Sequence, residues 1–125
     1  MSYGTLLTRT AHVRVEPTGR PQPASPLHRF EQTWNGIWVS GRVSLTSLTL
    51  TFIPHRLGPQ VKPLRWTMRD ITSVELTPGR VQRAVGVRTD GHVTWIRTLG
   101  AAGLAEALTE QVAKAQRSSR ESWSL

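Results

Sequence analysis

The sequence lacks cysteine entirely, which excludes disulfide bonds, thiolate metal ligands and a cysteine nucleophile. It also lacks an apolar run of the roughly 18 residues that a membrane-spanning helix needs. Its first residues, MSYGTLLTRTAHV, do not show the basic-then-apolar order of a signal peptide, and neither end carries a lipidation signal. From these absences we expect a cytoplasmic protein whose only contact with a membrane would be peripheral.

Acidic residues and lysine are scarce, whereas arginine is abundant. Eight Asp and Glu stand against 16 Lys and Arg in 125 residues, a formal net charge of +8, and only two of the 16 are lysine. Such a surplus favours an anionic partner, namely nucleic acid, membrane phosphates or an acidic protein surface. A second explanation is codon bias in a genome rich in G and C, because the arginines are dispersed along the chain.

Alternating apolar and polar residues predict short strands in the first half of the chain, at residues 7–16, 28–34, 36–45 and 48–53. Four prolines within 16–26 indicate an exposed loop after the first of these strands. The alternation places Ile37 and Leu48 on the core side and Arg42 on the other side. Gly41 falls on the apolar side, which indicates a bulge or a close approach of two backbones.

Two features indicate changes of chain direction in the second half of the sequence. The alternation that starts at Leu64 changes parity after Ile71, which predicts a bend near Asp70 and a separate strand on each side. The pair Asp90-Gly91 joins two alternating runs, 83–89 and 92–98. A type I′ turn requires positive φ at both central residues, and Asp-Gly suits it, so we predict a two-residue hairpin there.

The apolar period changes from that of a strand to that of a helix after Gly100. A helix of about four turns is predicted from Ala101, with an apolar face made of Leu104, Ala105, Leu108, Val112 and Ala115. Residues 1–116 are expected to form a single domain and 117–125 a flexible tail. The predicted fold is mostly β, a seven-stranded orthogonal sandwich or open barrel capped by one C-terminal helix.

The order of these segments resembles the GRAM branch of the pleckstrin-homology-like superfamily, in its bacterial type. The stretches SGRVSLTSLTLTFIPH, PLRWTMRDITSVEL and VGVRTDGHVTWI carry the resemblance, which covers about residues 34–115. The residues that fit the family's order are Gly41, Leu45, Thr46, Phe52, Ile71, Val74, Gly91 and Trp95. The chain lacks the spaced Lys/Arg signature of the phosphoinositide-binding members. The resemblance implies a pleckstrin-homology (PH)-like module that binds phospholipids or proteins without catalysis.

Residues that would indicate catalysis, a metal or a cofactor are few. The sequence contains no paired-histidine zinc spacing, no Walker sequence and no dinucleotide fingerprint. His55 and His92 are interpreted as ordinary surface residues, and Asp70 and Asp90 are assigned to a bend and a turn. The small residues around Gly100 are taken to let the helix start close against the last strand. We therefore expect no enzyme, no metal and no cofactor.

Three binding functions stay open. The favoured one is an anionic surface, either phospholipid headgroups or an acidic protein, bound by loop residues because strand arginines are expected to point in several directions. The loop residues are His55, Arg56, Lys62, Arg80 and Arg83. The alternatives are a protein-only scaffold subunit of an assembly, and nucleic acid bound by tryptophans that interleave with arginines on strands. A basic rim of loops would favour a lipid ligand. An arginine–tryptophan stripe on one face would favour nucleic acid, and an exposed apolar sheet edge would favour a protein partner.

Overall fold

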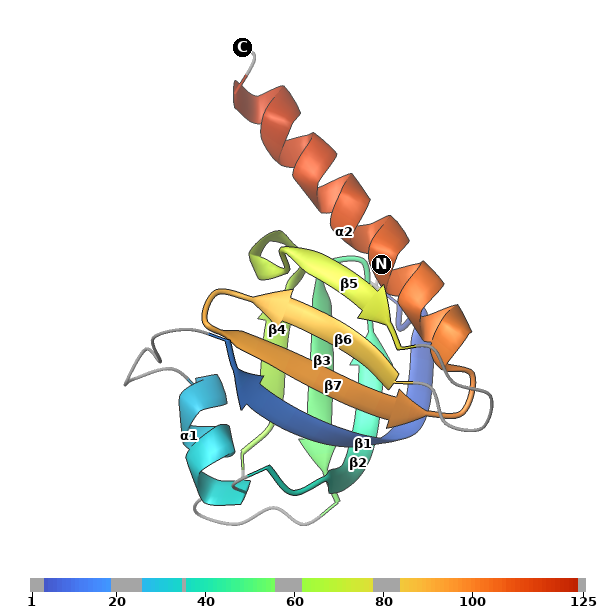
Figure 1. Ribbon diagram of the computed structural model, residues 1–125. Coiled ribbons are helices and arrows are strands. Elements are labelled where there is room, and N and C mark those ends of the chain that lie inside the picture. Colours follow the sequence, from blue (N-terminus) through green and yellow to red (C-terminus); the bar gives the residue numbers. More distant parts are fainter. Residues whose placement is uncertain (1–3, 19–25, 35, 56–61, 78–83, 124–125) are drawn as a thin grey trace.

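Figure 1 shows a computed structural model of the chain, which describes residues 4–18, 26–34, 36–55, 62–77 and 84–123. Within these residues, seven strands form one antiparallel sheet in the order β4-β3-β2-β1-β7-β6-β5. The strands are β1 (Leu7–Pro17), β2 (Val39–Leu45), β3 (Thr49–Pro54), β4 (Leu64–Thr67), β5 (Ser73–Leu76), β6 (Ala84–Thr89) and β7 (His92–Thr98). The predicted fold class, mostly β with a C-terminal helix, is confirmed.

The sheet curls into a half-barrel with two layers. In Figure 1, strands β5, β6 and β7 cross in front of β2, β3 and β4. Strand β1 belongs to both layers, because its first residues pair with β2 and its last residues pair with β7. The concave side holds the core, in which the fully buried side chains include Val13, Val43, Leu50, Phe52, Val85 and Ile96. We call the convex side the outer face.

Gly41 lies where β2 passes close to β3. On its other side, in β1, the small residue Ala11 lies opposite Gly41. A Cβ atom on Gly41 would lie 2.4 Å from the backbone oxygen of Ile53 and 2.5 Å from Cε1 of Phe52. The close approach predicted at Gly41 is therefore confirmed, and no side chain fits at this position.

The two predicted changes of direction in the second half are also present. Thr89 pairs with His92, so only two residues connect β6 to β7, and Gly91 has a φ of 84°. Between β4 and β5 the chain forms the short 3₁₀ helix η1 (Met68–Asp70). Asp70 Oδ2 accepts a hydrogen bond of 2.7 Å from Thr67 Oγ1, which holds the bend.

Helix α2 (Ala101–Trp123) starts at the predicted residue and packs against β5, β6, β7 and η1. Leu104, Leu108 and Val112 are buried there, as the apolar spacing predicts. The helix continues to Trp123, so residues 117–123, expected in a tail, are helical. In Figure 1 this last part projects beyond the sheet. It therefore has no core side to cover, which explains why the apolar spacing stops before the helix does.

One predicted strand is wrong, because residues 28–34 belong to helix α1 (Pro26–Trp34). Proline is favoured at the first position of a helix, since its missing N–H needs no partner there. Phe30 is buried and Trp34 packs on the core. The Phe30 ring lies edge-on to Phe52, with 6.2 Å between ring centroids. The spacing of Leu27, Phe30 and Trp34 is helical, but over so short a segment the same sequence also fits the weak alternation of a strand.

Three further side chains differ from the prediction. Ile37 and Leu48 were expected to face the core but are 61% and 56% exposed, because each lies just outside its strand. Leu48 sits in a turn where Thr46 Oγ1 accepts its N–H at 3.2 Å. His92 was expected on the surface but is only 1% exposed. Its position in β7 shares parity with buried Ile96, so its side chain faces the core.

Candidate anion-binding surface

Two of the five predicted loop residues, His55 and Lys62, lie in the described part of the chain, and both are exposed. Because Phe52 pairs with Leu64, His55 and Lys62 flank the same end of the β3–β4 hairpin. His55 N donates a hydrogen bond of 3.0 Å to Ser40 O, which ties this end to β2. Neither side chain forms an ion pair with another described residue.

Arg56, Arg80 and Arg83 lie outside the described residues, so the binding role of the loops stays a prediction. The residues that anchor the two loops are described. Ala84, which follows the second loop, pairs with Arg97, and Arg97 pairs with His12. His12 in turn pairs with Ser40, the hydrogen-bond partner of His55. One row of paired residues thus runs from the anchor of one loop to the anchor of the other.

Three of the strand arginines, Arg42, Arg65 and Arg97, share one face of the sheet. Arg42 and Arg65 are exposed, and each stands between two buried neighbours. Arg97 is half-buried and follows buried Ile96. Successive side chains of a strand point to opposite faces, so all three arginines lie on the outer face. Arg9 of β1 pairs with buried Val43 and so has the opposite parity, which means that the strand arginines as a whole do not share one direction.

The registers place these three arginines on a regular diagonal. Arg97 pairs with His12 of β1, His12 pairs with Ser40 of β2, and Arg42 lies two residues further along β2. The step to Arg65 has the same length and direction. Arg42 pairs with Ile53 of β3, and Thr51, two residues away on β3, pairs with Arg65 of β4. With strands 4.8 Å apart and a rise of 3.4 Å per residue, each step is about 12 Å along the sheet surface.

Trp38 lies at the β7 end of this diagonal. The guanidinium carbon of Arg97 is 4.1 Å from the centroid of the Trp38 ring, and that of Arg14 is 5.1 Å away. Arg14 also forms an ion pair with Glu16, so its charge is compensated. Arg97 is held against an aromatic ring instead, and it has no carboxylate partner among the described residues. Such cation–π contacts fix the position of a guanidinium group without neutralising it.

We call the outward side chains of His12, Trp38, Arg42, Arg65 and Arg97 the basic face. Strands β2, β3, β4 and β7 contain no Asp or Glu at all. Hydroxyl side chains occupy most of the remaining outward positions of β2 to β4: Ser40, Ser44, Thr49, Thr51 and Thr67. The basic face is therefore a set of three guanidinium groups separated mainly by small polar side chains, with the exposed Ile53 between Arg42 and Arg65.

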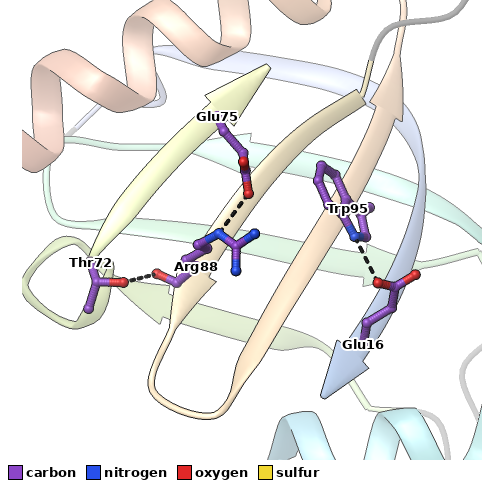
Figure 2. Close-up of polar contacts among 5 residues, drawn as sticks. All are labelled: Glu16, Thr72, Glu75, Arg88 and Trp95. Carbon is purple, nitrogen blue, oxygen red and sulfur yellow. Dashed lines mark hydrogen bonds and ion pairs between the residues drawn. The ribbon is translucent and has the colours of Figure 1, made fainter. Parts of the chain in front are cut away.

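The neighbouring part of the outer face has a different character. Both acidic residues of this part form hydrogen bonds, as Figure 2 shows. Trp95 Nε1 donates a hydrogen bond of 3.3 Å to Glu16, and Arg88 Nε donates one of 2.7 Å to Glu75. A Cβ atom on Gly86 would lie 2.7 Å from the Trp95 ring, so this indole packs flat on the sheet. Arg88 and Glu75, the charged residues of the described parts of β5 and β6, are therefore paired with each other, unlike the arginines of the basic face.

The sequence carried a signal for this arrangement. Arg42 was assigned to the outward parity of its strand, and the same alternation applies to Arg65 and Arg97. What the sequence does not show is the strand order, which brings β7 and β4 into register with β2. Trp66 is buried in the core. Trp38 and Trp95 are half-buried on the outer face.

An apolar sheet edge, the feature expected of a protein-only scaffold, is absent from the described strands. The two edge strands are β4 and β5. The exposed residues of β4 are Arg65 and Thr67, and Leu76 is the one exposed apolar residue of β5. Nor do the described residues contain a cluster of three His, Asp or Glu that could hold a metal ion. Across the same ranges no helix is both long and apolar enough to cross a bilayer.

The curled seven-stranded sheet with a helix against it defines a PH-like fold, and comparison with solved structures agrees. The chain is similar to the PH domain of USP37, with 16% sequence identity, a TM-score of 0.56, and coverage of 90% of this chain and 98% of that one. It is also similar to the C-terminal domain of an unknown protein from Leishmania infantum, with 11% identity, a TM-score of 0.59, and coverage of 88% and 84%. No protein-family model matches the sequence, and no curated protein matches it significantly.

Proposed function

We propose that the chain is a non-catalytic PH-like domain, of the GRAM branch, that binds an anionic partner through the basic face and the loops anchored beside it. The observation that carries this proposal is the outward array of Arg42, Arg65 and Arg97 on strands without any carboxylate. An array of like charges costs stability through self-repulsion, and strands β2, β3, β4 and β7 carry no Asp or Glu to offset it, which favours a role in binding.

The chemistry of the basic face suits oxyanions. A planar guanidinium group binds phosphate or carboxylate oxygens with two parallel hydrogen bonds, and this geometry explains a preference for arginine over lysine. The chain has 14 arginines and two lysines, in agreement with that preference. Phospholipid headgroups, acidic proteins and nucleic acid all offer such oxygens, and the likeness to a PH domain supports a binding role.

Retention on immobilised heparin, eluted with salt, tests the proposal. The variant Arg42→Gln/Arg65→Gln/Arg97→Gln removes three charges from the basic face. The control Arg69→Gln/Lys114→Gln/Arg117→Gln removes three charges from exposed positions of η1 and α2. Both variants have the same net charge, so a difference between them reports the position of the removed charges; in the control, the loss of Lys114 also leaves Glu110 without its ion-pair partner.

We expect wild type and the control variant to elute at clearly higher salt than the basic-face variant, because only the latter loses contacts with the polymer. Thermal unfolding of all three proteins checks that each is folded. Elution of the two variants at the same salt concentration would mean that retention follows net charge and not the basic face, which would contradict the proposal.

A further inference from the structure

The diagonal of arginines on the basic face has the form of a track for a polymer. Its three charges are evenly spaced, at about 12 Å, over a path of about 24 Å. We propose that the basic face binds single-stranded nucleic acid, laid along the diagonal from Arg97 on β7 to Arg65 on β4. This inference rests on the proposed function and names its ligand.

The curvature of the sheet favours a flexible ligand. Arg97 lies on a strand of one layer and Arg65 on a strand of the other, and the two layers cross in Figure 1. A flat membrane cannot reach both ends of a path that follows a convex surface. A single strand can, because its backbone bends freely and carries one phosphate per nucleotide.

Trp38 and Arg97 add a stacking platform at one end of the track. The half-buried indole is held against the Arg97 guanidinium at 4.1 Å. Aromatic rings and guanidinium planes are the groups on which unpaired bases stack, and every nucleotide supplies a flat ring, whereas a lipid headgroup supplies none. The combination of a charged track and a platform therefore favours nucleic acid over the other anions.

Fluorescence anisotropy with a labelled oligo(dT) of about 16 nucleotides, within the site sizes of small single-strand binders, measures this binding. For three phosphate contacts on a single strand, the slope of log K against log salt is about −2. We therefore expect binding by wild type to weaken roughly 20-fold when salt rises from about 50 to 200 mM.

Variants separate the track from the platform. Arg42→Gln/Arg65→Gln/Arg97→Gln is expected to bind at least about tenfold more weakly at low salt and to lose most of the salt slope. Arg42→Gln/Arg65→Gln serves as a second variant, because both side chains are exposed and the change is not expected to disturb folding. Trp38→Leu is expected to bind roughly tenfold more weakly with an unchanged salt slope, since it removes stacking but no charge.

The control Arg69→Gln/Lys114→Gln/Arg117→Gln is expected to retain nearly all of the wild-type affinity for the oligonucleotide. Equal losses in the control and the basic-face variant would overturn the inference. Parallel assays use vesicles of phosphatidylserine and phosphatidylcholine, and polyglutamate. Binding to either of these without binding to the oligonucleotide would overturn the nucleic-acid inference while the proposed function survives, and binding to no anionic probe would overturn both.

Discussion

At the scale of single residues, Gly41 shows how one missing Cβ atom permits β2 and β3 to pack closely. A methyl group there would overlap the Ile53 backbone oxygen and the Phe52 ring. Neither neighbour can move freely, because one is part of β3 and the other is in the core. We expect Gly41→Ala to lower the free energy of unfolding by about 1–3 kcal/mol, as overpacking usually does.

Urea denaturation measures this loss, and Gly103→Ala is the matched control. A Cβ atom on Gly103 meets nothing within 4 Å, and alanine is the better helix former by about 1 kcal/mol. The control is therefore expected to unfold at equal or higher urea. A Gly41→Ala variant as stable as the control would show that β2 and β3 do not approach each other this closely.

Gly91 is constrained by its own backbone conformation. Its φ of 84° lies in the left-handed region, which β-branched residues avoid. We expect Gly91→Val to cost more than about 1 kcal/mol in denaturant titration, and Gly91→Asn to cost less, because asparagine tolerates this region. Identical stability of the valine and asparagine variants would argue against the two-residue turn.

At the scale of elements, helix α2 stabilises the domain through a few apolar side chains. Leu108 is fully buried, whereas Ala113 on the same helix is exposed. Leu108→Asp buries a charge without a partner, and we expect it to lower stability by at least about 3 kcal/mol. Ala113→Asp introduces the same residue at the surface and is expected to leave the melting temperature nearly unchanged. If both variants melt like wild type in circular dichroism, the helix is not docked through Leu108.

The elements that the sequence predicted well are those whose signal is local. The strands that alternate over several residues, the Asp90-Gly91 turn and the start of α2 each follow from neighbouring residues. Helix α1 was missed because its three apolar positions form a single short stripe. Leu48 was misplaced because a hydrogen-bonded turn at Thr46, and not hydrophobicity, decides where β3 begins.

At the scale of the whole molecule, the candidate site depends on strand order, which no local pattern contains. The residues of the basic face are separated by up to 85 positions in the sequence, from His12 to Arg97. They become neighbours because β1 pairs with both β2 and β7. The sequence could therefore supply the surplus of arginine and the outward parity of Arg42, but not the diagonal that they form.

Ala84 and His55, which flank the two predicted loops, lie at the two ends of one row of paired residues. A vesicle is flat on the scale of the domain, so we expect loop residues, and not the strand arginines, to decide membrane binding. Arg56→Glu/Lys62→Glu and Arg80→Glu/Arg83→Glu are each expected to abolish flotation with anionic vesicles at low salt. Arg42→Gln/Arg65→Gln is expected to change flotation little.

Neutral vesicles are the control for this experiment, and a second control is salt. Exposed charges are screened beyond about 8 Å at physiological ionic strength, so flotation with anionic vesicles is expected to weaken steeply as salt rises. If the loop variants float as well as wild type, the loops are not part of the binding surface, and the proposed class of ligand is unaffected. Wild-type protein that floats with neither kind of vesicle would exclude a lipid ligand, and the anionic partner would then be a protein or a nucleic acid.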